Sequence, residues 1–101
     1  MSQGLPIALP MDAVAEFCRR HGIARLSLFG SVLRDDFTPE SDIDVLVEFL
    51  PDRTPTLASI AVMEDDLSTM LGRRVDLRTP QELSRYFRDE VMASARVLHA
   101  A

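Results

Sequence analysis

The feature that most constrains this 101-residue chain is the apolar segment 43–49, which reads Ile-Asp-Val-Leu-Val-Glu-Phe. The segment is rich in β-branched residues, which favour strands. Pro51-Asp52 follow it closely, and Ser41-Asp42 come directly before it. The sequence therefore predicts a short core strand with acidic residues at its entrance.

Two amphipathic helices are predicted around this strand. Apolar residues recur at helical spacing in residues 11–21, and Gly22 directly after them fits a helix end. A second apolar helical face begins at Leu57 and is closed by Gly72. Glu64 falls on that second face and conflicts with the pattern.

Two further strands are predicted, at residues 25–29 and 74–78. The first alternates between apolar and polar residues and ends at Gly30-Ser31, after which residues 31–36 could make one or two helical turns. The second is a short apolar segment with Asp76 at its centre. A loop at residues 38–40 would connect the helical turns to the core strand.

The C-terminal region is predicted to be one amphipathic helix. Thr79-Pro80-Gln81-Glu82 contains a capping-box pair and a proline at the first helical position. Apolar residues continue at helical spacing as far as Leu98, and Tyr86 is expected to pack at the edge of the core. The predicted architecture is a single α/β domain over residues 1–101, with a small mixed sheet of three or slightly more strands and about four helices.

Composition narrows the classes of partner. Sixteen acidic residues against eleven basic ones give a net charge of −5, which argues against stable binding of long DNA or RNA. Cys18 is the single cysteine, so no intramolecular disulfide can form and a reducing compartment is expected. No apolar run approaches the roughly 20 residues of a membrane span. We expect a cytoplasmic protein without a membrane partner, and the sequence leaves open whether it forms homo-oligomers.

The candidate catalytic residues are three aspartates. Asp42 and Asp44 are two residues apart at the start of a strand, so their carboxylates should share one face. Such a pair suits Mg²⁺, although an isolated Asp-x-Asp near a loop is also typical of capping or solvation. Asp44 is surrounded by apolar residues, where an uncompensated carboxylate is costly, so a metal ion or an arginine is expected beside it.

Asp76 lies between apolar residues in the third predicted strand and would reach the same face if the two strands are neighbours. Three carboxylates on one face predict a two-metal site for phosphoryl displacement. The alternative for Asp76 is a buried salt bridge to Arg34, Arg73 or Arg74.

Gly30-Ser31 could bind phosphate, because free N–H groups at the start of a short helix favour anions. A lone Gly-Ser is a common turn, and its functional value depends on its distance from the acids. Arg34, one turn further on, could contact a phosphate or could equally be a solvated helix residue.

Together these motifs resemble those of a known family. Gly30-Ser31, ten intervening residues and Asp42-Ile43-Asp44 are similar to the signature of the minimal nucleotidyltransferases, within the DNA polymerase β-like superfamily. Arg34, Asp76 and the amphipathic C-terminus also fall where family members have them.

The resemblance implies a polymerase β-like fold, a triphosphate-holding loop at Gly30 and Ser31, Mg²⁺ ligands at Asp42 and Asp44, and a third catalytic carboxylate at Asp76. It also implies ATP as the nucleotide donor and two Mg²⁺ ions as cofactors.

Family members of this length resemble the antitoxin half of two-gene toxin–antitoxin modules. The resemblance implies a partner that is a HEPN-domain ribonuclease toxin, silenced when AMP is moved from ATP onto one of its tyrosines. An acidic antitoxin would complement a basic RNA-binding partner. The alternatives are a nucleotidyltransferase acting on a small molecule or on itself, with Tyr86 as the self-target, and a non-catalytic antitoxin that neutralises its toxin by contact. Nothing in the sequence identifies the preferred nucleobase or the acceptor.

Overall fold

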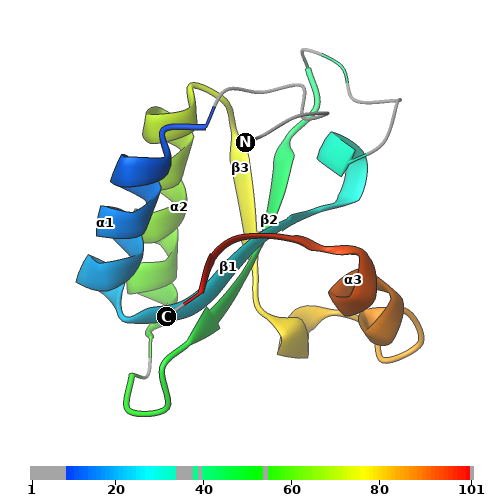
Figure 1. Cartoon of the computed structure of the whole chain (residues 1–101). Helices are drawn as coiled ribbons and strands as arrows, with labels where there is room; N and C mark the ends of the chain where they lie inside the picture. Colours follow the sequence, from blue (N-terminus) through cyan, green and yellow to red (C-terminus); the bar gives the residue numbers. More distant parts are fainter. Residues whose placement is uncertain (1–8, 34–37, 39, 54, 101) are drawn as a thin grey trace.

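The computed structural model describes residues 9–33, 38, 40–53 and 55–100, and in these ranges the chain has a mixed α/β fold (Figure 1). The described elements are three α-helices, two short 3-10 helices (η) and four strands. In chain order they are α1 (Met11–His21), β1 (Ile23–Phe29), η1 (Gly30–Leu33), β2 (Ile43–Phe49), α2 (Leu57–Leu71), β3 (Val75–Arg78), η2 (Pro80–Glu82), α3 (Arg88–Ser94) and β4 (Arg96–Ala100). No helix in these ranges is long and apolar enough to cross a bilayer.

The four strands form one mixed sheet in the order β3-β2-β1-β4. β1 runs antiparallel to β2 on one side and to β4 on the other, whereas β2 and β3 are parallel. The mixed sheet predicted from the sequence is confirmed, and β2 has the predicted bounds 43–49. Because β2 lies between β1 and β3, residues from all three strands can meet around it.

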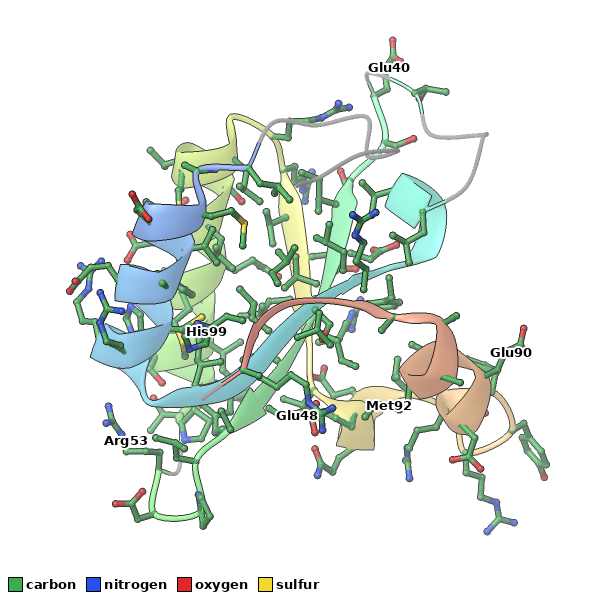
Figure 2. All side chains as sticks on the ribbon, in the orientation of Figure 1. Glu40, Glu48, Arg53, Glu90, Met92 and His99 are labelled. Atoms are coloured by element: carbon green, nitrogen blue, oxygen red, sulfur yellow. The ribbon has the colours of Figure 1, made fainter. Side chains whose placement is uncertain are left out.

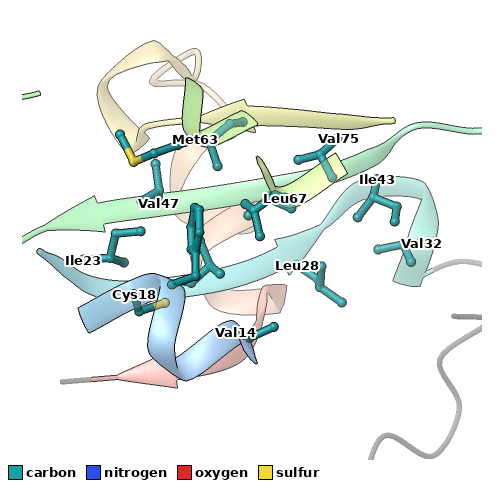
Figure 3. Close-up of a cluster of buried hydrophobic side chains, with 14 residues drawn as sticks. Val14, Cys18, Ile23, Leu28, Val32, Ile43, Val47, Met63, Leu67 and Val75 are labelled. Carbon is teal, nitrogen blue, oxygen red and sulfur yellow. The ribbon is translucent and has the colours of Figure 1, made fainter. Parts of the chain in front are cut away.

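Helices α1 and α2 cover one face of the sheet, and the hydrophobic core lies between them and the strands (Figure 1 and Figure 3). Helix α1 contributes Val14, Phe17 and Cys18 to this core, and α2 contributes Met63 and Leu67. The Cys18 thiol is fully buried, and this burial raises its pKa to about 11. Cys18 is therefore an inert packing residue.

The predicted single C-terminal helix is wrong. The capping box at Thr79 is present, since its N–H donates to Glu82 Oε1 at 2.9 Å, but it opens only the short η2. The backbone adopts an extended conformation at Leu83, and α3 does not begin until Arg88. The backbone is extended again at Ala95, directly before β4. The C-terminal region therefore contains a short helix and a fourth strand.

The reason for this difference is a non-local interaction. Without β4, strand β1 would expose a row of N–H and C=O groups at its free edge. Residues 96–100 pair with that edge, and Leu26 lies opposite His99 in the ladder. A helical pattern in the local sequence does not reveal that this distant edge is available for pairing.

The outer edge of β3 is covered by side chains of α2. The N–H of Leu77 donates to Glu64 Oε2 at 2.8 Å, and the N–H of Val75 donates to Ser68 Oγ at 2.9 Å. The Ser68 hydroxyl in turn donates to the Glu64 backbone carbonyl at 2.8 Å. Glu64, which conflicts with the apolar face of its helix, is therefore an acceptor for the strand edge that this helix covers.

We expect Glu64→Ala to lower the free energy of unfolding by about 1–3 kcal/mol, because it leaves the partly buried Leu77 N–H without its charged acceptor. Glu64→Gln keeps a carbonyl acceptor at the same length and should cost clearly less. Asp65→Ala removes an exposed charge from the next position of α2 and should have little effect. Denaturant unfolding measures all three variants, and equal losses for Glu64→Ala and Glu64→Gln would contradict this role.

Candidate active site

The register of the sheet brings two of the candidate aspartates together. In the parallel pair β2–β3, Asp44 lies opposite Asp76, and in the antiparallel pair β1–β2 it lies opposite Phe29. The neighbouring residues Ile43 and Val45 are buried in the core beneath the helices. Because strand side chains alternate between faces, Asp44 and Asp76 lie on the face opposite α1 and α2. The condition set for Asp76 from the sequence, that its strand neighbours the strand of Asp44, is therefore met.

The turn from β1 into η1 is built around a close contact with Asp44. Gly30 begins η1 with a φ of +77°, a conformation that side-chain-bearing residues rarely adopt. A Cβ at this position would overlap Oδ2 of Asp44 and lie only 3.1 Å from its Cγ. Glycine therefore allows the Asp44 carboxylate to lie directly against the backbone of the turn.

A cavity of about 590 Å³ opens beside this contact, on the face of the sheet away from α1 and α2. One side is formed by the β1–η1 turn and β2, with Phe29, Gly30, Leu33 and Asp44 in the wall. The volume lies within the range of small-molecule sites, about 300–1,000 Å³. Two of the residues proposed from the sequence, Gly30 and Asp44, thus line a cavity large enough for a nucleotide.

The other side of this cavity is formed by Glu90, Val91 and Ser94 of α3. Sequence reasoning does not single them out, because the predicted continuous helix treats Val91 as a core residue. The break before α3 and the pairing of β4 with β1 place this short helix across from the β1–η1 turn (Figure 1). No local pattern at residues 90–94 signals a binding wall.

Asp42 precedes β2 by one residue and is exposed, whereas Asp44 is half-buried. The loop that carries Asp42 is held by Arg73, which donates to the carbonyls of Thr38 at 2.7 Å and Ser41 at 3.3 Å. Arg73 comes after Gly72, the residue that caps the end of α2, so one guanidinium links the end of that helix to the entrance of β2. Arg73 is a positioning residue that the sequence suggests only as a salt-bridge partner of Asp76.

The carboxylate of Asp76 is paired with Arg78 at 3.1 Å, and neither side chain is buried. The hydrogen bond to Asp76 raises the pKa of the Arg78 guanidinium. None of the three arginines considered for Asp76 from the sequence is the partner in this ion pair. In the described ranges, no three His, Cys, Asp or Glu side chains are close enough to bind one ion. Asp76 therefore lies opposite Asp44 in the sheet with one carboxylate oxygen engaged by Arg78.

Three other predicted residues have different outcomes. The side chain of Ser31 and the whole of Arg34 lie outside the described part of the structure. Tyr86, predicted to pack at the core edge, is instead 88% exposed in the turn before α3. This prediction fails because the helix that would have buried Tyr86 does not begin until Arg88.

The donor set fits Mg²⁺. The ion prefers carboxylate oxygens and commonly takes one or two from the protein, with water and substrate phosphates completing its octahedron. Asp42 and Asp44 supply two carboxylates two residues apart. The close contact with Gly30 places the Asp44 carboxylate in the cavity wall. Like charges at this spacing are stabilised when a cation binds between them.

Comparison with known proteins supports this assignment of the fold and shows the family. A family model described as a nucleotidyltransferase domain matches residues 11–98. A protein of Methanocaldococcus jannaschii, named as a candidate protein adenylyltransferase, is 33% identical over 76 residues, which are 75% of this chain and 80% of that protein. The protein adenylyltransferase MntA of Thermococcus cleftensis is 37% identical over 62 residues, and these cover 61% of each protein.

Solved structures show the same fold. A structure described as a candidate minimal nucleotidyltransferase has a TM-score of 0.69 and 38% identity, and the match covers 84% of this chain and 85% of that one. A toxin–antitoxin structure with AMP-PNP has a TM-score of 0.73 and 21% identity, and the match covers 92% of this chain and 75% of that one. On the strength of the family match over most of its length, this chain belongs to the nucleotidyltransferase-domain family.

Proposed function

We propose that this chain is a Mg²⁺-dependent protein adenylyltransferase that transfers AMP from ATP to a tyrosine of a partner protein. The observation that carries the proposal is the Asp44 carboxylate, which lies against Gly30 in the wall of a nucleotide-sized cavity and in register with Asp76. Relatives named as protein adenylyltransferases support the reaction class. The AMP-PNP in a protein of the same fold supports ATP as donor.

Asp42 and Asp44 would hold Mg²⁺, and two ions are expected when the triphosphate and Asp76 complete the site. The metal would supply charge neutralisation on the phosphate oxygens. The N–H groups at the start of η1 would contact the triphosphate beside it. In this arrangement the protein chiefly positions the reactants and stabilises the charge that develops during transfer.

The reaction joins the tyrosine oxygen to the α-phosphorus of ATP. The bond between the α-phosphorus and the α–β bridging oxygen breaks, and pyrophosphate leaves. The tyrosine proton must be removed, and Asp76 is the carboxylate that we assign to assist this step. The ion pair with Arg78 orients the Asp76 carboxylate in the described structure.

The proposed partner is a HEPN-domain toxin, and the chain would act as its antitoxin. A protein of the same fold forms a complex with a tri-AMPylated HEPN toxin of Shewanella oneidensis. The net charge of −5 suits a basic, RNA-binding partner. The cavity lies at the surface of a small domain, where a partner protein can bring a tyrosine to the α-phosphate.

Incubating this protein and the product of its neighbouring gene with labelled ATP and Mg²⁺ tests the proposal. We expect label on the neighbour's protein, and we expect it to disappear with EDTA and in an Asp42→Ala, Asp44→Ala double variant. If this chain instead neutralised the toxicity of the neighbour's protein without transferring label to it, the chain would be a non-catalytic binding antitoxin.

A parallel reaction with the protein alone tests the self-modifying alternative, which the exposure of Tyr86 makes accessible. Label on this chain that is absent in Tyr86→Phe would identify it as a self-target. We expect the partner's tyrosine to be the main acceptor, so labelling of the partner should be unchanged in Tyr86→Phe.

A further inference from the structure

The proposed function gives no role in holding the triphosphate or the metal to the part of the cavity wall formed by α3. Among the described residues, the polar side chains that line the cavity are Asp44 on one side and Glu90 and Ser94 on the other. Glu90 is exposed and projects from α3 at the rim (Figure 2), and Val91 is half-buried beside it. Two polar residues and one apolar residue of a separate element thus line the cavity, together with Gly30 and Asp44.

The hydrogen bonds within α3 determine what this wall can offer to a ligand. The Ser94 hydroxyl donates to the backbone carbonyl of Glu90 at 2.9 Å, so its proton is already used within the helix. What remains available to the cavity is the lone pairs of Ser94 Oγ and the carboxylate oxygens of Glu90, and both accept hydrogen bonds. The wall therefore favours a ligand with hydroxyl or amine donors.

The covalent structure of ATP places such donors next to the triphosphate. If the α-phosphate lies beside Asp44, the ribose follows it directly and must lie in the remaining part of the same cavity. The ribose carries two hydroxyl groups that can donate to acceptors, and carboxylates commonly bind ribose hydroxyls in nucleotide-binding proteins. Its sugar ring and base offer apolar surface to Val91.

We propose that α3 is the ribose-binding wall of this site, with the Glu90 carboxylate accepting a hydrogen bond from the ribose hydroxyls and Val91 packing against the nucleoside. This inference rests on the proposed function. It makes Glu90 a residue that selects ribonucleotides over deoxynucleotides. The position of Glu90 at the exposed rim keeps its charge solvated, which limits its repulsion of the triphosphate.

Titrations with ATP and with 2′,3′-dideoxy-ATP, both in the presence of Mg²⁺, test this assignment. We expect Glu90→Ala to weaken ATP binding about 10-fold, the effect of losing one hydrogen bond to a charged group, and to leave dideoxy-ATP binding unchanged. Asp89→Ala is the matched control, because Asp89 is exposed in the same first turn of α3 and does not line the cavity. It should alter neither affinity.

Equal weakening of both nucleotides by Glu90→Ala would overturn the ribose contact, and so would tighter binding of both, which would show that Glu90 repels the triphosphate. In either case the wild-type protein still binds ATP and the proposed function stands. Failure of the wild-type protein to bind either nucleotide would overturn the proposed function together with this inference.

Discussion

Asp44→Asn should reduce AMP transfer to the partner protein by roughly 10²–10³-fold or more, the range seen when one preorganised charge-stabilising group is removed from an active site. Asparagine has nearly the same shape, so the contact with Gly30 and the fold should be retained. The substitution removes from the wall of the cavity the negative charge that we propose binds Mg²⁺. Initial rates of labelled-ATP transfer, with thermal unfolding on the same samples, measure the two effects separately.

Asp52→Asn is the matched control for this charge change. Asp52 is exposed in the turn that follows β2, at the opposite end of the strand from Asp44. Its substitution should leave the transfer rate within about twofold of the wild type, because substitutions of exposed residues far from the proposed active site have small effects. A comparable loss in both variants would mean that overall charge, and not the site at Asp44, determines the rate.

Gly30→Ala should lower transfer about 100-fold, because the new Cβ displaces the Asp44 carboxylate and misplacement of a catalytic group by about 1 Å can have an effect of this size. The clash is with the end of a side chain, which can swing away, so folding should survive. The left-handed backbone adds a stability cost of about 1–2 kcal/mol. Transfer rates and denaturant unfolding together show whether activity falls far more than stability.

Gly72→Ala separates the effect of backbone strain from the effect of displacing the Asp44 carboxylate. Gly72 has a similar φ of +69°, but a Cβ there would have no atom within 4 Å. It should therefore show a similar loss of stability with nearly wild-type transfer. If Gly72→Ala lost activity to the same extent as Gly30→Ala, backbone strain would explain both results. The contact between Gly30 and the Asp44 carboxylate would then have no special importance.

Much of the site could be predicted from the sequence because its residues lie on strands with strong local patterns. The segment 43–49 is apolar and β-branched, and its bounds are confirmed. The apolar neighbours of Asp44 and Asp76 indicate that each lies on a core strand, and the register confirms that the strands are adjacent. The sequence does not predict the Asp76–Arg78 pair, in which two alternate residues on one strand share a face.

The C-terminal third could not be predicted in the same way. Leu83, Phe87 and Val91 are spaced as on one helix, but β1 provides an edge that only a strand can pair with. Pairing of residues 96–100 with that edge limits α3 to Arg88–Ser94 and leaves Tyr86 in the preceding turn. The cavity wall at Glu90 exists only because of this arrangement. It depends on contacts between segments that are far apart in the chain.

The hydrogen bonds that support the site are also non-local. Arg73 contacts carbonyl groups 32 and 35 residues earlier in the chain, and Glu64 binds a strand N–H 13 residues later. Backbone acceptors and donors are present at every residue, so the sequence cannot indicate which ones an arginine or a glutamate will reach. Glu64 shows the consequence, because its conflict with an apolar face is visible in the sequence but its cause is not.

The central claim is that the site around Gly30 and Asp44 transfers the nucleotidyl group of ATP. The most direct measurement is a pair of reactions of this protein and its neighbouring gene's product with Mg²⁺ and ATP labelled either on the α-phosphate or on the γ-phosphate. Attack at the α-phosphorus predicts label on the partner from α-labelled ATP alone, with the γ-label released in pyrophosphate. Transfer of the γ-label to the partner, or of neither label, would contradict the claim.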